Sequence, residues 1–164
     1  MKQLILVRHA KAVPYGYSDD FNRELTERGE NDAITIGSRL KEQKFVPGTI
    51  ISSPAKRALQ TAHLFARTLN FPENKIRIEE DLYEGMTTND FITLLHELPE
   101  EASTVFVFGH NPTVFYLVSN LVKFFNGDMP TCSTVGISFS VDKWDEIEAR
   151  RGQIDFHFAP RMFK

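Results

Sequence analysis

Cysteine and long apolar runs are both scarce in this sequence of 164 residues. Its single cysteine, Cys132, cannot form a disulfide within the chain, and the apolar run at residues 4–7 is too short for a signal peptide or a membrane-spanning helix. We therefore expect a cytoplasmic protein in a reducing compartment, with no membrane partner. Cys132 has no basic cluster near it in the sequence, which favours a structural thiol over a reactive one.

The sequence also has no marked excess of basic or acidic side chains. The chain has 19 Lys and Arg residues against 22 Asp and Glu residues, a formal net charge of -3. It has no basic stripe, so a nucleic-acid partner is not expected. Neither a His-Glu-x-x-His pattern nor a glycine-rich phosphate loop occurs, so we expect no metal and no cofactor. Any anion site must therefore be built from a few local residues.

The apolar residues that are present, 41% of the chain, are enough for one substantial core. No repeat, linker or low-complexity tract divides the chain, which predicts one domain over residues 1–164. Short β-branched or aromatic runs at residues 4–7, 49–51 and 104–108 lack polar alternation and predict buried parallel strands.

Helical patterns separate these runs. They predict helices over residues 27–43 with an N-cap at Thr26, over 54–68, from about 88 to 98, and after Pro112. Residues 133–141 and 154–158 predict two further strands, arranged as an antiparallel pair at the sheet edge. The alternation of strands and helices favours an α/β three-layer sandwich, a mostly parallel central sheet flanked by helices.

Polar residues follow each predicted parallel strand. Arg8 and His9 follow the first, Ser52 and Ser53 follow the second with Arg57 nearby, and His110 follows the third. Taken singly, each could be an ordinary surface, capping or turn residue. Ligands of open α/β sheets bind beyond the carboxyl ends of the strands, so their joint occurrence there predicts a convergent cationic pocket.

The motifs that carry these residues resemble the histidine phosphatase superfamily, and within it the short branch of SixA-type phosphohistidine phosphatases. The matching segments are residues 6–12, 20–29, 51–62, 82–84 and 109–112, which span most of the chain in family order. The resemblance implies a phosphoglycerate mutase-like fold. One departure is visible, because Ala10 stands where the wider superfamily has glycine.

The resemblance implies a role for each strand-end residue. His9 would be the nucleophile that forms a phosphohistidine intermediate, and imidazole is a good nucleophile at neutral pH. Arg8 and Arg57 would hold the nonbridging phosphoryl oxygens, since planar guanidinium forks fit them better than lysine does. His110 would donate to the same oxygens in the transition state.

Two further residues enter through the resemblance. Arg23 corresponds to a substrate contact, and its alternative is a surface salt bridge. Glu84 corresponds to the proton donor for an alkoxide leaving group, and its alternative is a structural role. An imidazole leaving group needs less acid assistance than an alkoxide does.

The function predicted is a metal-independent phosphatase whose partner is a phosphorylated substrate, with a phosphohistidine-bearing protein as the leading candidate. A small-molecule phosphomonoesterase is the alternative. A phosphoglycerate-type mutase is a further alternative. Such mutases usually have a longer chain with insertions that enclose a sugar phosphate, so the short sequence argues against it. A binding module for phosphorylated partners would be expected to have lost His9 or His110, and both are present.

Overall fold

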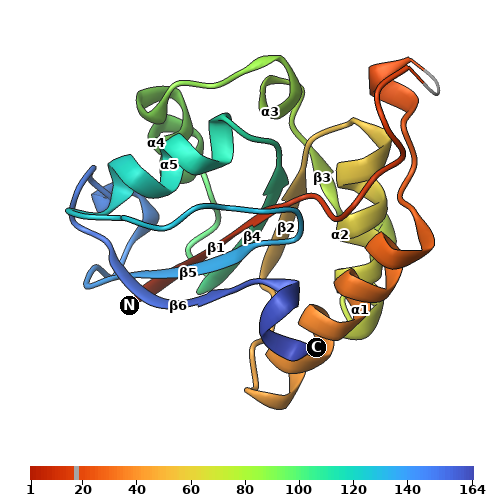
Figure 1. Ribbon diagram of the computed structural model, residues 1–164. Coiled ribbons are helices and arrows are strands. Elements are labelled where there is room, and N and C mark those ends of the chain that lie inside the picture. Colours follow the sequence, from red (N-terminus) through yellow and green to blue (C-terminus); the bar gives the residue numbers. More distant parts are fainter. Residues whose placement is uncertain (17–18) are drawn as a thin grey trace.

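The computed structural model describes residues 1–16 and 19–164, which are built around one six-stranded sheet (Figure 1). The strand order is β3-β2-β4-β1-β5-β6. The strands are β1 (Lys2–Arg8), β2 (Thr49–Ser52), β3 (Arg77–Ile78), β4 (Thr104–Gly109), β5 (Thr134–Phe139) and β6 (Gln153–Phe158). Strands β3, β2, β4 and β1 are parallel, whereas β5 is antiparallel to β1 and to β6. The predicted parallel strands and the antiparallel pair at the edge are confirmed.

Helices cover both faces of this sheet (Figure 1). The pair α1 (Glu27–Glu42) and α2 (Lys56–Thr68) packs on one face, and the pair α4 (Thr88–His96) and α5 (Thr113–Leu121) packs on the other. This is the three-layer α/β sandwich that the sequence predicted. Within the described residues, none of the helices is long and apolar enough to cross a membrane.

Each central strand contributes to two separate cores. In β1, Ile5 and Val7 pack with α1 and α2, whereas Leu4 and Leu6 pack with α4 and α5. All four side chains are fully buried. Because both faces of the strand are covered, its sequence shows no polar alternation.

The helix starts match the sequence pattern with one difference, and α1 and α4 end at Glu42 and His96, slightly before the predicted ends. Helix α1 begins after Thr26, whose hydroxyl accepts a hydrogen bond from the Gly29 amide at 3.0 Å, as predicted. Helix α2 begins at Lys56 and not at Pro54, because the Ser53 hydroxyl accepts the Ala55 amide at 3.2 Å and holds this segment in a non-helical turn. Two short elements, β3 and α3 (Asp81–Glu84), were not predicted.

The first turn of α1 is docked against the backbone that follows β1. The Thr26 amide donates to the Lys11 carbonyl at 2.9 Å, and a Cβ atom at Gly29 would collide with that same carbonyl oxygen. A backbone atom cannot move aside as a flexible side chain can. The close approach therefore requires glycine at this position and fixes α1 relative to the segment after His9.

We therefore expect Gly29→Ala to lower the free energy of unfolding by about 1–3 kcal/mol, because the added methyl group forces the helix or the Lys11 backbone to shift. Thr35→Ala, at an exposed position of the same helix, is the control and should change stability by less than about 0.5 kcal/mol. Denaturant unfolding of both variants measures this. Equal stabilities would show that the contact with Lys11 is not tight.

Candidate active site

The carboxyl ends of β1, β2 and β4 meet at one edge of the sheet. Beyond the strand pairing, the His9 amide donates to the Gly109 carbonyl at 3.0 Å, and the Ser53 amide donates to the Phe108 carbonyl at 2.9 Å. These bonds continue the two parallel ladders by one residue. His9, Ser53 and His110 are thus brought together by strand register, although they are far apart in the sequence.

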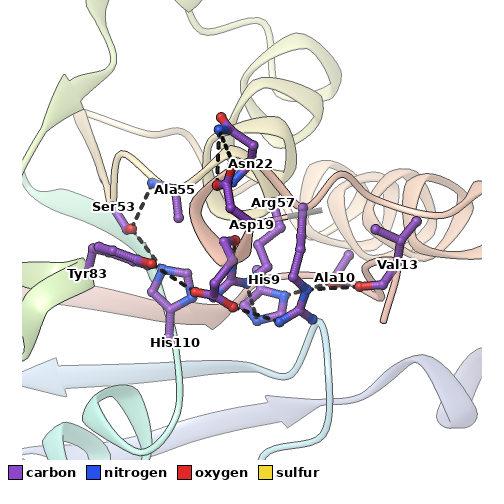
Figure 2. Close-up of polar contacts among 12 residues, drawn as sticks. His9, Ala10, Val13, Asp19, Asn22, Ser53, Ala55, Arg57, Tyr83 and His110 are labelled. Atoms are coloured by element: carbon purple, nitrogen blue, oxygen red, sulfur yellow. Dashed lines mark hydrogen bonds and ion pairs between the residues drawn. The ribbon is translucent and has the colours of Figure 1, made fainter. Parts of the chain in front are cut away.

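His9 is held in one orientation by its own backbone. Its Nδ1 lies 2.8 Å from the Ala10 carbonyl oxygen, and a carbonyl can only accept, so Nδ1 carries the hydrogen. The neutral ring then has its lone pair on Nε2, which faces Arg57 Nε at 3.4 Å (Figure 2). The side chain is buried. This arrangement fits Nε2 for nucleophilic attack.

His110 lies beside His9, with the ring centroids 5.2 Å apart. Its Nε2 lies 2.8 Å from the Ser53 hydroxyl oxygen, which already accepts the Ala55 amide (Figure 2). The Ser53 hydrogen is therefore available to donate to Nε2, an arrangement that leaves a hydrogen on Nδ1. In the part of the chain that the structure describes, Nδ1 is buried with no hydrogen-bond partner. It is a donor that a bound oxyanion could use.

Arg8 and Arg57 bring two guanidinium groups to the pair of histidines. Arg8 donates from Nη1 to the Met129 carbonyl at 3.0 Å, and its buried Nε has no partner among the residues described. Arg57 uses all three of its nitrogens: Nε faces His9, while Nη1 donates to the Asp20 carbonyl at 2.6 Å and Nη2 to the Asp20 carboxylate at 3.2 Å.

Asp20 was not among the residues singled out from the sequence. Besides Arg57, its carboxylate accepts hydrogen bonds from Arg23 Nη1 and from the Tyr83 hydroxyl, both at 2.9 Å. Partial burial acts to raise the pKa of Asp20, but the hydrogen bonds from Tyr83 and Arg23 and the charge of Arg57 lower it to about 2. The carboxylate is therefore ionised at neutral pH.

Tyr83 connects this carboxylate to the histidines. Its ring packs edge-on against His110, with centroids 5.7 Å apart, and also edge-on against Phe21, with centroids 5.2 Å apart. Tyr83 lies in the segment 82–84, which resembles the family, but the sequence led us to predict its neighbour Glu84 as the site residue. A hydroxyl next to a carboxyl in the sequence carries no signal that would have distinguished the two.

A pocket of ≈ 260 Å³ opens over these groups, and its lining contains four permanently charged cations, two histidines and no carboxylate. The lining residues are Arg8, His9, Lys11, Ala12, Arg23, Arg57, His110, Asn111 and Thr131. Five of the six predicted site residues are thus brought together. The sixth, Glu84, is exposed at the end of α3 and is not part of this lining, so its role as proton donor stays a prediction.

Burial and the neighbouring cations keep both histidines neutral. Desolvation is the main reason why the pKa of His9 falls from 6.5 to about 3, with further lowering from His110, Arg57 and Arg8. Desolvation and Arg57 likewise lower the pKa of His110 to about 4. A neutral His9 is the nucleophilic form at physiological pH.

Among residues 1–16 and 19–164, no group of three or more His, Cys, Asp or Glu side chains is placed to hold a metal ion. Positive charge in the pocket comes from arginine and lysine side chains instead. These can bind an oxyanion through charge-assisted hydrogen bonds.

A buried histidine at a strand end, with two guanidinium groups beside it on an α/β sandwich, is an arrangement suited to phosphoryl-transfer proteins. The model of the histidine phosphatase superfamily (branch 1) matches residues 4–104. The chain therefore belongs to this superfamily.

Solved structures show the same fold over nearly the whole chain. The protein histidine phosphatase SixA, determined with tungstate, superposes with a TM-score of 0.85 at 24% identity and 99% coverage of both chains. A mycobacterial glucosyl-3-phosphoglycerate phosphatase superposes with a TM-score of 0.70 at 17% identity, over 94% of this chain and 97% of that one. The predicted fold class is confirmed.

Curated relatives are similar over shorter stretches. The mitochondrial serine/threonine-protein phosphatase Pgam5 of Drosophila melanogaster is 33% identical over 75 residues, 46% of this chain. A 2,3-bisphosphoglycerate-dependent phosphoglycerate mutase of Erythrobacter litoralis is 35% identical over 97 residues, 55% of this chain. The matched regions cover only 26% and 42% of those two relatives.

The lowered pKa of His9 predicts a pH-dependent stability. Between its ordinary pKa of 6.5 and about 3, the unfolded chain takes up a proton at His9 that the folded chain resists. The stability linked to neutral His9 is therefore present above pH 6.5 and is lost as the pH falls through this window. We expect the Tm of the wild type to fall more than that of His9→Asn between about pH 7 and about pH 4. Parallel declines in thermal unfolding would contradict this.

Proposed function

We propose that the protein is a phosphatase that transfers a phosphoryl group first to Nε2 of His9 and then to water. The observation that carries this proposal is the hydrogen bond from His9 Nδ1 to the Ala10 carbonyl, because it leaves the Nε2 lone pair directed toward Arg57. Membership of the histidine phosphatase superfamily supports the same role.

The reaction has two balanced steps. In the first, the Nε2 lone pair forms a bond to phosphorus while the bond from phosphorus to the leaving group breaks and its electron pair departs with that group. In the second, a water oxygen attacks phosphorus, the P–N bond returns its electrons to Nε2, and inorganic phosphate leaves. Arg8, Arg57 and His110 donate to the nonbridging oxygens, which carry most of the charge in both transition states.

We further propose that the substrate is a phosphohistidine on a protein. The pocket of ≈ 260 Å³ is smaller than the roughly 300–1,000 Å³ of sites that enclose small molecules. It can accept a phosphoryl group at the end of a side chain more readily than a whole sugar phosphate. This favours a phosphorylated side chain on a protein, such as phosphohistidine, over the small-molecule phosphomonoesterase and mutase alternatives. We also propose a cytoplasmic location, because a single cysteine cannot form a disulfide within the chain and this fits a reducing compartment.

The covalent intermediate is directly testable. We expect brief incubation with a labelled phosphohistidine protein to leave label on His9, labile to acid and stable to alkali as a phosphoramidate is. Peptide mapping after rapid quenching locates the label, and His9→Ala should remove both the label and turnover. Label on Ser52, Ser53 or Cys132 would overturn the mechanism.

The oxyanion donors predict a second result. Vanadate, tungstate and inorganic phosphate should inhibit competitively, and EDTA should leave activity unchanged, because side chains supply the positive charge. Arg57→Ala and His110→Ala should each lower kcat by on the order of a hundredfold, the usual effect of removing one oxyanion donor. Activity lost in EDTA and restored by a divalent ion would show that a metal takes part.

A further inference from the structure

Asp20 introduces a negative charge beside an otherwise cationic site. Three donors hold its carboxylate: Arg57 Nη2, Arg23 Nη1 and the Tyr83 hydroxyl. A carboxylate offers about four acceptor positions, so about one is left for another donor. The Asp20 side chain is 33% exposed, so an incoming group can reach it.

One edge of the Arg57 guanidinium contacts both His9 and Asp20. Nε of Arg57 faces His9 Nε2, and the adjacent Nη2 faces Asp20 Oδ2. In-line transfer requires the nucleophile and the leaving atom to lie on opposite sides of phosphorus. A phosphoryl group bound along this edge between His9 and Asp20 would have its leaving group on the side of Asp20.

An ionised carboxylate in this place suits some leaving groups and not others. It has no proton to give to an alkoxide, which is too basic to depart without one. It can, however, accept a hydrogen bond from a ring N–H that carries positive charge. The second nitrogen of a phosphorylated imidazole protonates near neutral pH, and in that form the ring departs as neutral imidazole.

We propose that Asp20 is a specificity-determining residue that selects protonated imidazole as the leaving group by pairing its carboxylate with the ring N–H. This inference rests on the proposed function, since it assigns the substrate preference of the same site. Arg23 and Tyr83 are positioning residues that hold the carboxylate (Figure 2 shows Tyr83 beside His110 and Arg57 beside His9).

The test compares kcat/KM for free phosphohistidine and for p-nitrophenyl phosphate. Nitrophenolate departs without a proton and carries no positive charge, so it gains nothing from Asp20. Asp20→Asn should lower kcat/KM for phosphohistidine by on the order of tenfold more than it lowers kcat/KM for p-nitrophenyl phosphate, because only phosphohistidine loses a charge-assisted hydrogen bond to the carboxylate. Tyr83→Phe, which keeps the ring but removes one donor to the carboxylate, should shift the ratio in the same direction by less.

Glu24→Gln is the matched control, because Glu24 is an exposed carboxylate in the same segment and pairs with Lys56. It should leave both substrates unchanged. Equal losses on the two substrates in Asp20→Asn would mean that Asp20 only positions Arg57, and equal gains would mean that it competes with substrate. Either result overturns the inference. A wild-type protein that hydrolyses p-nitrophenyl phosphate but neither free phosphohistidine nor a phosphohistidine protein would instead overturn the proposed substrate.

Discussion

The position of β4 between β1 and β2 in the sheet determines where the strand-end side chains of the site lie. The last residues of β1 and β4 are paired, Arg8 with Gly109, and Ser52 of β2 lies opposite Phe108. The next residues of β1 and β4, His9 and His110, therefore emerge level with each other at this edge, and Ser53 emerges there one residue lower. A shift of one residue in either ladder would turn the polar side chains toward the opposite face of the sheet.

Two features set the charges of the site: the two histidines are neutral, and the buried Arg57 is paired with a carboxylate. Buried among arginines, His9 and His110 stay neutral, because a charged imidazole there would be poorly solvated and repelled by its neighbours. Arg57, which is also buried, is paired with the Asp20 carboxylate. One ionised carboxylate thus stabilises the guanidinium without lying in the pocket lining itself.

Most of the fold and the centre of the site could be predicted from local patterns. Runs such as 104–108 signal a buried strand by composition, and Thr26 signals a helix start by its capping hydroxyl. Elements of two to four residues, β3 and α3, are too short to show a period. Tyr83 and Glu84 both lie in the short helix α3. The sequence around them therefore did not show that it is Tyr83 that packs against His110.

The sequence by itself determined the α/β class, the residues at the strand ends and the family they resemble, because each of these depends on short segments whose meaning is local. Only the tertiary structure decided that Asp20 joins Arg57, Arg23 and Tyr83, and that Glu84 is not part of the pocket lining. Those contacts join residues separated by as many as 63 positions, and no period or motif encodes them. They depend on where residues 19–23 lie relative to Arg57 of α2, which only long-range contacts decide.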